Sequence, residues 1–279
     1  MADKSDHYTL STPKMADGTT KYYFSRSDDE IAARVFPFHV HGGLEIYILL
    51  EGDVSFAVES SLYKMSNGDA IITRPNEIHN CILNSDSVHR HICFWFDTSN
   101  DFLFGDFLAH SFGKNNLIVP DRPSKARLLE IYDALYEASE KKDVYAQHYL
   151  ILEMLAIFRR FVSSEVVSGE MPPLLKDILN DIERNFSTIR SLDYFTEKYY
   201  ISSSTLNRLF KRYLRTTPKM YIESKRLSYS RLLLDSGKSV LAACMESGFP
   251  DYSNYIRLFK KRFDITPKQY KASKDRGRN

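Results

Sequence analysis

Four side chains in the N-terminal half have the chemistry of metal ligands and a spacing that could bring them together. His39 and His41 are separated by one residue, Glu45 follows shortly after, and His79 lies further along the chain. Side chains alternate along a strand, so the first two imidazoles would point to the same face. Three imidazoles and a carboxylate suit a divalent transition metal. We predict that the four side chains meet inside a β-barrel.

The same residues resemble the sequence motifs of cupins. The pattern of His39, His41, Glu45 and then Gly52 after six residues is similar to the first cupin motif. The second motif is approximated by Pro75 and His79, although Glu77 stands where glycine is usual. The resemblance implies a cupin-like barrel over residues 1–122.

Three uses of this constellation stay open. A metal-dependent cupin enzyme or metal sensor fused to a second domain would use the metal, an effector pocket would bind a small molecule such as a sugar, and a structural remnant would do neither. We expect the effector pocket, with no cofactor. Its candidate residues are His39, His41, Glu45, His79, Tyr47 and Arg34, and no spacing argument selects the last two. GxSxG, Walker A and GxGxxG motifs are absent, so we do not expect an enzyme.

Short β-branched and aromatic segments separated by turns fill residues 20–120, which predicts a sandwich or barrel. His89-Arg90-His91 is another His-x-His pattern, but no carboxylate follows it at a ligand-like distance. We interpret it as part of a strand with one polar face.

The hydrophobic period changes over residues 123–163, where apolar residues recur every three to four positions. This indicates a helical pair, with Ser124 and Asp143 as the expected N-caps. The pair could cover the barrel, form a dimer seam, or do both. Residues 164–173 are rich in serine, glycine and proline, which predicts a linker.

Charge is divided unevenly along the chain. Residues 1–173 hold 16 Lys+Arg and 25 Asp+Glu, a net charge of −9, whereas residues 174–279 hold 22 and 11, a net charge of +11. The basic half is suited to a polyanion. Three cysteines without CxxC spacing fit a reducing cytoplasm. The sequence shows no apolar signal core and no membrane-spanning run, so we expect a cytoplasmic protein without a membrane partner.

The basic half contains an internal repeat. The segment 208–211, Arg-Leu-Phe-Lys, returns at 257–260, and Thr217-Pro218 returns as Thr266-Pro267 at the same offset of 49 residues. Self-similarity at a fixed offset indicates one structural unit used twice.

Each repeated unit reads as a helix-turn-helix, over about 192–214 and 239–263. Ser202 is the expected N-cap of the first reading helix. Thr217 is the expected cap of the next helix, from about Pro218 to Leu234, which would join the two units. The predicted outer faces carry arginine and asparagine, which suit guanine and adenine edges, and further cations suited to phosphates. The candidate DNA-binding residues are Ser204, Asn207, Arg208, Lys211, Arg212, Tyr252, Ser253, Asn254, Arg257, Lys260 and Lys261.

Residues 185–271 resemble the duplicated helix-turn-helix domain of the AraC/XylS family of bacterial transcription regulators. The matching residues are Leu206, Arg208, Phe210-Lys211, Thr217-Pro218, Tyr221, Arg226-Leu227, Leu232-Leu233, Gly248-Phe249, Asp251, Ser253, Arg257, Phe259-Lys260-Lys261, Thr266-Pro267 and Tyr270. The resemblance implies that the two outer faces enter successive major grooves. The sequence departs from the family at Arg215 and Asp264, where glycine is frequent.

The expected architecture is therefore α+β and multidomain. A cupin-like barrel with a helical pair would precede an all-α domain, residues 174–275, with two helix-turn-helix units. The expected function is sequence-specific binding of double-stranded DNA under the control of a small-molecule effector. The resemblance favours an activator, which implies RNA polymerase as a partner, and the helical pair suggests a homodimer.

Overall fold

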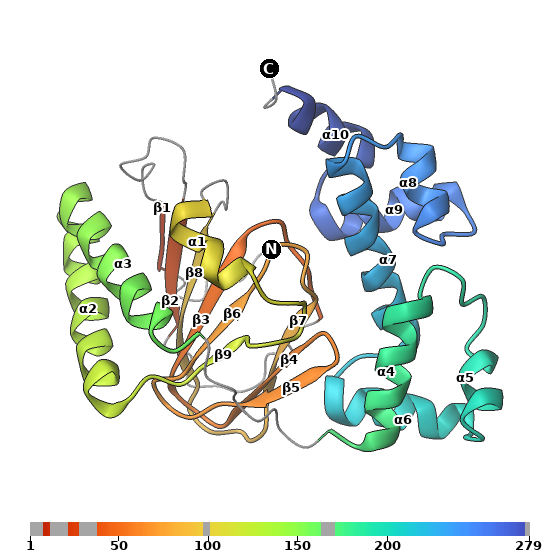
Figure 1. Ribbon diagram of the computed structural model, residues 1–279, viewed down its shortest axis with the longest axis horizontal. Coiled ribbons are helices and arrows are strands. Elements are labelled where there is room, and N and C mark those ends of the chain that lie inside the picture. Colours follow the sequence, from red (N-terminus) through yellow and green to blue (C-terminus); the bar gives the residue numbers. More distant parts are fainter. Residues whose placement is uncertain (1–7, 12–21, 28–37, 97–100, 163–170, 277–279) are drawn as a thin grey trace. The chain divides into compact units, whose positions relative to one another are not determined.

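The computed structural model describes residues 8–11, 22–27, 38–96, 101–162 and 171–276 (Figure 1). These residues divide into two compact units, one formed mainly from the first 170 residues and one formed mainly from the residues that follow. The first is rich in strands and the second is helical, as predicted. Among the described residues, no helix is long and apolar enough to cross a membrane.

Two sheets form the centre of the first unit. The larger sheet is antiparallel and has the strand order β1 (Tyr8–Ser11), β2 (Tyr22–Ser27), β8 (Arg90–Phe96), β3 (Leu44–Glu51), β6 (Ala70–Thr73) and β9 (Leu117–Ile118). The smaller sheet has the order β5 (Ser61–Lys64), β4 (Val54–Val58) and β7 (His79–Leu83).

Side chains alternate along β3, so the strand contributes to two separate hydrophobic cores. Leu44, Ile46 and Ile48 belong to the core that the helices cover. Tyr47 and Leu49, which point the other way, belong to the core shared with the smaller sheet. The larger sheet is therefore buried on both faces, and this accounts for a strand that is apolar at almost every position.

Helices cover one face of the larger sheet (Figure 1). They are α1 (Asp101–Leu108), α2 (Arg122–Glu140) and α3 (Val144–Arg159). Ile131 and Leu135 of α2 and Phe158 of α3 are fully buried in that core. Fully burying each such side chain stabilises the fold by about 1.5–3 kcal/mol. The predicted covering role of the helical pair is confirmed.

The N-cap of α2 differs from our prediction. Asp121, not Ser124, caps the helix, and its carboxylate accepts a hydrogen bond from the Ser124 backbone N–H at 2.9 Å. Pro123 lies in the first turn, where its missing N–H costs nothing, so the helix begins before the serine. The prediction for α3 is confirmed, because Asp143 accepts from Ala146 N at 3.0 Å.

The second unit contains two helix-turn-helix motifs joined by a long helix (Figure 1). Its helices are α4 (Pro173–Asn185), α5 (Asp193–Lys198), α6 (Ser203–Leu214), α7 (Pro218–Asp235), α8 (Val240–Glu246), α9 (Tyr252–Phe263) and α10 (Pro267–Arg276). Two predicted caps are confirmed. Ser202 accepts from Thr205 N at 3.1 Å, and Thr217 accepts from Met220 N at 3.2 Å.

The two reading helices end in the same backbone conformation. Arg215 after α6 and Asp264 after α9 are left-handed, with φ of 52° and 60°. The two departures from glycine noted in the sequence therefore fall where glycine is favoured, and a side chain there costs conformational energy. The matching ends are structural evidence for the repeat.

Gly248 lies in the turn between α8 and α9, against the connection between α4 and α5. Its φ is +85°, and a Cβ atom built there would lie 2.2 Å from the carbonyl oxygen of Ser187. Gly237, after α7, also has a positive φ, of +91°, but a Cβ there would meet nothing within 4 Å. Comparison of the two glycines therefore separates the cost of a left-handed backbone from the cost of steric overlap.

Backbone strain alone costs about 1–3 kcal/mol. We predict that Gly248→Ala lowers the free energy of unfolding by more than this, because the new side chain also overlaps the backbone. Gly237→Ala is the matched control and should lose only the cost of the left-handed conformation, about 1–2 kcal/mol. Urea unfolding followed by circular dichroism measures both variants. Equal losses would show that the contact with Ser187 carries no weight.

Candidate nucleic-acid interface and effector site

The predicted outer surface of α6 is accessible to solvent. We call the side chains of Ser204, Asn207, Arg208, Lys211 and Arg212 the α6 face. All are exposed except Asn207, which is half-buried. Leu206, Phe210 and Leu214 lie on the opposite stripe and are fully buried. The helix thus presents cations and hydrogen-bonding groups outward while its apolar stripe anchors it.

The α6 face lines a shallow hollow together with Arg215. Four of its six lining side chains are cationic: Arg208, Lys211, Arg212 and Arg215. Such a concentration of positive charge attracts polyanions, and guanidinium groups match phosphate oxygens geometrically.

The predicted outer surface of α9 repeats this arrangement. The α9 face consists of Tyr252, Ser253, Asn254, Arg257, Lys260 and Lys261. All are exposed except Asn254, which is half-buried. Tyr255 and Phe259 are fully buried on the opposite side.

Both asparagines already make hydrogen bonds within the protein. Asn254 Oδ1 accepts from the Arg257 guanidinium at 2.6 Å, and Asn207 Nδ2 donates to the Ser203 carbonyl at 2.8 Å. Contact with a base edge would exchange these bonds for new ones. The net gain from each exchange is therefore smaller than the bond to the base alone.

The four predicted ligand residues do come together. One ligand atom from each of His39, His41, Glu45 and His79 lies within 4.8 Å of the others. A β-bridge places two of them side by side, because His39 N donates to His79 O at 3.0 Å and His79 N donates to His39 O at 3.1 Å. His79 and Glu45 are buried, and the other two are half-buried.

The donor types, three imidazoles and a carboxylate, suit a divalent transition metal.

Glu45 also belongs to the interior of the barrel. Its carboxylate accepts hydrogen bonds from Trp95 Nε1 at 3.0 Å and from the Cys93 thiol at 3.7 Å. Burial raises the pKa of the Cys93 thiol well above its usual range, and the charge of Glu45 raises it further. Burial likewise raises the pKa of Cys81 to about 12, against the smaller opposing effect of its bond to Tyr47. Both thiols therefore stay protonated at neutral pH and are poor nucleophiles.

His89 and His91 lie in the same interior, which the sequence pattern did not reveal. Both are buried, their rings stack with centroids 4.7 Å apart, and the Tyr47 hydroxyl lies 2.6 Å from His89 Nε2. Arg90 between them is exposed and pairs with Glu51 at 2.7 Å. The strand has one polar face, as predicted, but that face points inward.

The remaining predicted effector residues differ in their positions. Tyr47 lies in the core between the two sheets and is 3% exposed, so it reaches this interior but not the surface. Burial raises its pKa well above the usual range, as do the nearby thiols. Arg34 lies outside the described residues.

Comparison with known families agrees with this geometry. Residues 21–153 match the AraC-like ligand binding domain, and residues 195–273 match a helix-turn-helix domain. The chain belongs to the AraC family of transcription regulators and combines an effector-binding domain with a DNA-binding domain.

Individual relatives are similar over almost the whole chain. The virulence regulon transcriptional activator VirF of Yersinia enterocolitica is 24% identical over 264 residues, which cover 88% of this chain and 95% of that protein. The transcriptional activator RhaS of Citrobacter koseri is 23% identical over 256 residues, covering 86% and 89%. Among solved structures, apo ToxT of Vibrio cholerae covers 90% of this chain and 96% of its own, with 14% identity and a TM-score of 0.38.

Proposed function

We propose that the α6 face and the α9 face read base sequence in two successive major grooves. Asn207, Arg208, Asn254 and Arg257 have the side chains that pair with adenine and guanine edges. The flanking hydroxyls on the two faces, together with Tyr252, would complete the contacts near the helix starts. This division of roles follows the residue types on each accessible surface.

The carrying observation is the equivalence of the two reading helices at the fixed offset. The N-caps Ser202 and Asp251, the buried Phe210 and Phe259, and the left-handed ends correspond position by position. The accessible cations correspond in the same way: Arg208 with Arg257, Lys211 with Lys260, and Arg212 with Lys261. Two equivalent helices that present equivalent cationic surfaces suit a ligand with a repeating structure, such as duplex DNA.

The lysines and the remaining arginine would supply affinity rather than sequence choice. Lys211, Arg212, Lys260 and Lys261 are exposed in the last turn of their helices. Cations there neutralise phosphates and release counterions, so affinity should fall steeply as salt rises.

We also propose that the histidine cluster forms the polar centre of the effector site. His39 and His41 are half-buried, and together with the buried Glu45 and His79 they form one cluster of imidazole and carboxylate groups. These groups donate and accept hydrogen bonds, which suits a polyhydroxylated ligand such as a sugar. Tyr47 and Arg34 stay in this assignment as predictions.

No metal and no catalysis are part of the proposal. The relatives named above are transcription activators. The alternative is a metal sensor or a metal-dependent enzyme at the same four residues, whose donor types suit a metal.

A homodimer through α3 is the oligomeric state that we propose. Tyr145, Tyr149 and Leu152 lie one helical turn apart, and they are 88%, 64% and 43% exposed. Apolar side chains at this spacing form a stripe suited to a second helix. Tyrosine is also enriched at interface hot spots.

The relatives' names support activation through RNA polymerase as the outcome of DNA binding. A regulator of bacterial promoters acts where the chromosome is, so we place the protein in the cytoplasm.

We predict that Arg208→Ala weakens binding to a selected specific site by about 1–3 kcal/mol and weakens binding to random DNA much less. Arg257→Ala should behave in the same way. Fluorescence anisotropy at several salt concentrations measures both affinities. Arg90→Ala, which removes an exposed cation from the first unit, is the control. Equal losses on specific and random DNA would remove the base-reading role.

For the histidine cluster, we expect purified protein to carry no stoichiometric transition metal by elemental analysis, and His79→Ala to leave the metal content unchanged. His110→Ala is the matched control outside the cluster. A stoichiometric metal that is lost only in His79→Ala would establish the metal-dependent alternative.

For the oligomeric state, Tyr149→Glu should raise the dimer dissociation constant at least about tenfold, since truncating an interface hot spot costs more than about 1.4 kcal/mol. Sedimentation equilibrium gives the constant. Leu241→Glu alters an equally accessible apolar residue of α8, 56% exposed, and should leave it unchanged. A dimer that is insensitive to Tyr149→Glu must use another surface.

A further inference from the structure

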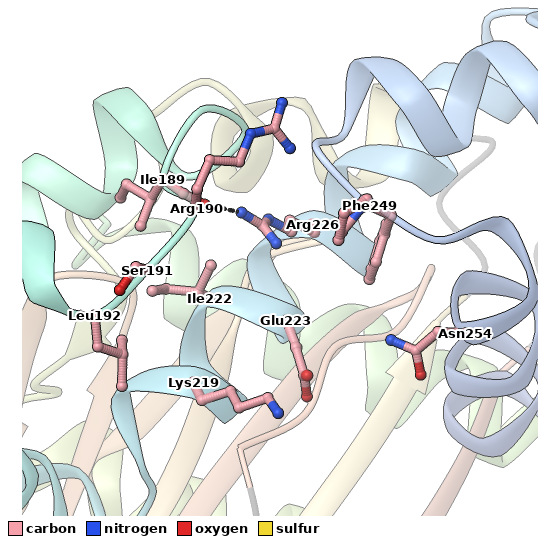
Figure 2. A pocket seen from close by; sticks show the side chains of 11 residues that line it. Ile189, Arg190, Ser191, Leu192, Lys219, Ile222, Glu223, Arg226, Phe249 and Asn254 are labelled. Carbon is pink, nitrogen blue, oxygen red and sulfur yellow. Dashed lines mark hydrogen bonds between the residues drawn. The ribbon is translucent and has the colours of Figure 1, made fainter.

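A further basic surface lies in the helical unit, in a cavity of about 360 Å³ (Figure 2). Three segments line it: the connection between α4 and α5, one side of α7, and the turn between α8 and α9 with the first turn of α9. Ile222 and Phe249 are buried and form an apolar part of the cavity wall. We call it the α7 cavity. None of its cations was predicted from the sequence as a DNA-binding residue.

Three cations and one anion line the α7 cavity. Lys219, Glu223 and Arg226 project from α7, and Arg190 comes from the loop beside Arg226 (Figure 2). Arg190 and Lys219 are exposed, and neither forms an ion pair with a residue that the structure describes. The side chains together carry a net charge of +2.

Arg226 is half-buried, and two backbone carbonyls hold its guanidinium in place. Its Nε donates to the carbonyl oxygen of Phe186 at 2.9 Å, and its Nη2 donates to that of Ile189. Burial lowers the pKa of Arg226, the neighbouring charge of Arg190 lowers it further, and the carboxylate of Glu223 acts in the opposite direction. Arg190 and Arg226 carry like charges and repel each other. An anion between them would relieve this repulsion.

The position of the α7 cavity links it to DNA. Asn254 lines the cavity and also belongs to the α9 face. The opposite wall, Ser191 and Leu192, directly precedes α5 of the first motif. The cavity therefore lies between the two motifs, on a side that includes a predicted base-reading residue. A duplex that offers successive major grooves to α6 and α9 must present its sugar–phosphate backbone to the region between them.

We propose that the α7 cavity binds a phosphate of the DNA backbone between the two grooves that α6 and α9 read. Arg190 and Lys219 make the contact, and Arg226 contributes charge from a fixed position. The inference rests on the proposed function, because it requires a duplex bound across both faces. The ligand chemistry is a phosphate group, which inorganic phosphate or a nucleotide could also supply.

Glu223 allows the proposal to be tested in the opposite direction from the cations. Its carboxylate lies in the same cavity and repels a phosphate. Glu223→Gln should therefore tighten binding to DNA, whereas Arg190→Ala and Lys219→Ala should weaken it. Arg226 is unsuitable for substitution because it binds two backbone carbonyls.

The test uses the full chain and a duplex selected in vitro, with hydroxyl-radical footprinting to locate the two contacted grooves. Neutral methylphosphonates then replace the phosphates between those grooves, one at a time. We expect one replacement to reduce affinity at least about tenfold, because it removes a charge-assisted hydrogen bond. A methylphosphonate outside the footprint is the control.

The variants assign that effect to the cavity. With Arg190→Ala plus Lys219→Ala, the sensitive methylphosphonate should no longer matter, and the salt dependence of log K should become less negative by about 1 per lost contact. Lys176→Ala, an exposed cation on α4, should retain full sensitivity. Thermal unfolding with inorganic phosphate or adenosine monophosphate tests the other sources.

The outcomes are distinct. If the wild-type protein protects no duplex, the proposed function fails. If it binds DNA but no central methylphosphonate weakens binding, or if the double variant keeps the sensitivity, the phosphate site is wrong and the proposed function stands. Stabilisation by free phosphate without any methylphosphonate effect would also overturn the DNA assignment.

Discussion

Each reading helix depends on a narrow apolar stripe. Leu206, Phe210 and Leu214 hold α6, and Tyr255 and Phe259 hold α9, all fully buried. At about 1.5–3 kcal/mol for each buried side chain, these few residues must offset the mutual repulsion of the cations on the outer surface. The side chains that face solvent can therefore be chosen for DNA alone. In the proposed function, stability and recognition therefore belong to opposite sides of the same two helices.

Much of the helical unit could be predicted because its signals are local. The N-caps Ser202 and Thr217 act on backbone groups three residues away, and both were found as predicted. The fixed offset of 49 residues identified the second motif from the first. The meeting of His39, His41, Glu45 and His79 was predictable for a related reason, since strand alternation and a resemblance constrained it.

Other features depend on contacts that sequence spacing does not encode. Asp121 caps α2 because a proline in the first turn permits an earlier start, so a serine three residues on was the wrong choice. His89 and His91 face inward because of their register beside Tyr47, which a short motif cannot reveal. The α7 cavity joins side chains from three separated segments, and its cations show no pattern along the chain. Packing decides all three cases.

The contact between Gly248 and Ser187 affects which DNA targets the protein can bind. Main chain lies against main chain there, without an intervening side chain that could change rotamer. In the proposed function, this contact helps to fix the distance between the two recognition surfaces. A target with one additional base pair between its half-sites would turn the second half-site away around the helix axis, and the protein could not stretch to follow it. The nucleic acid would have to twist or bend instead, so its deformability becomes part of what is recognised.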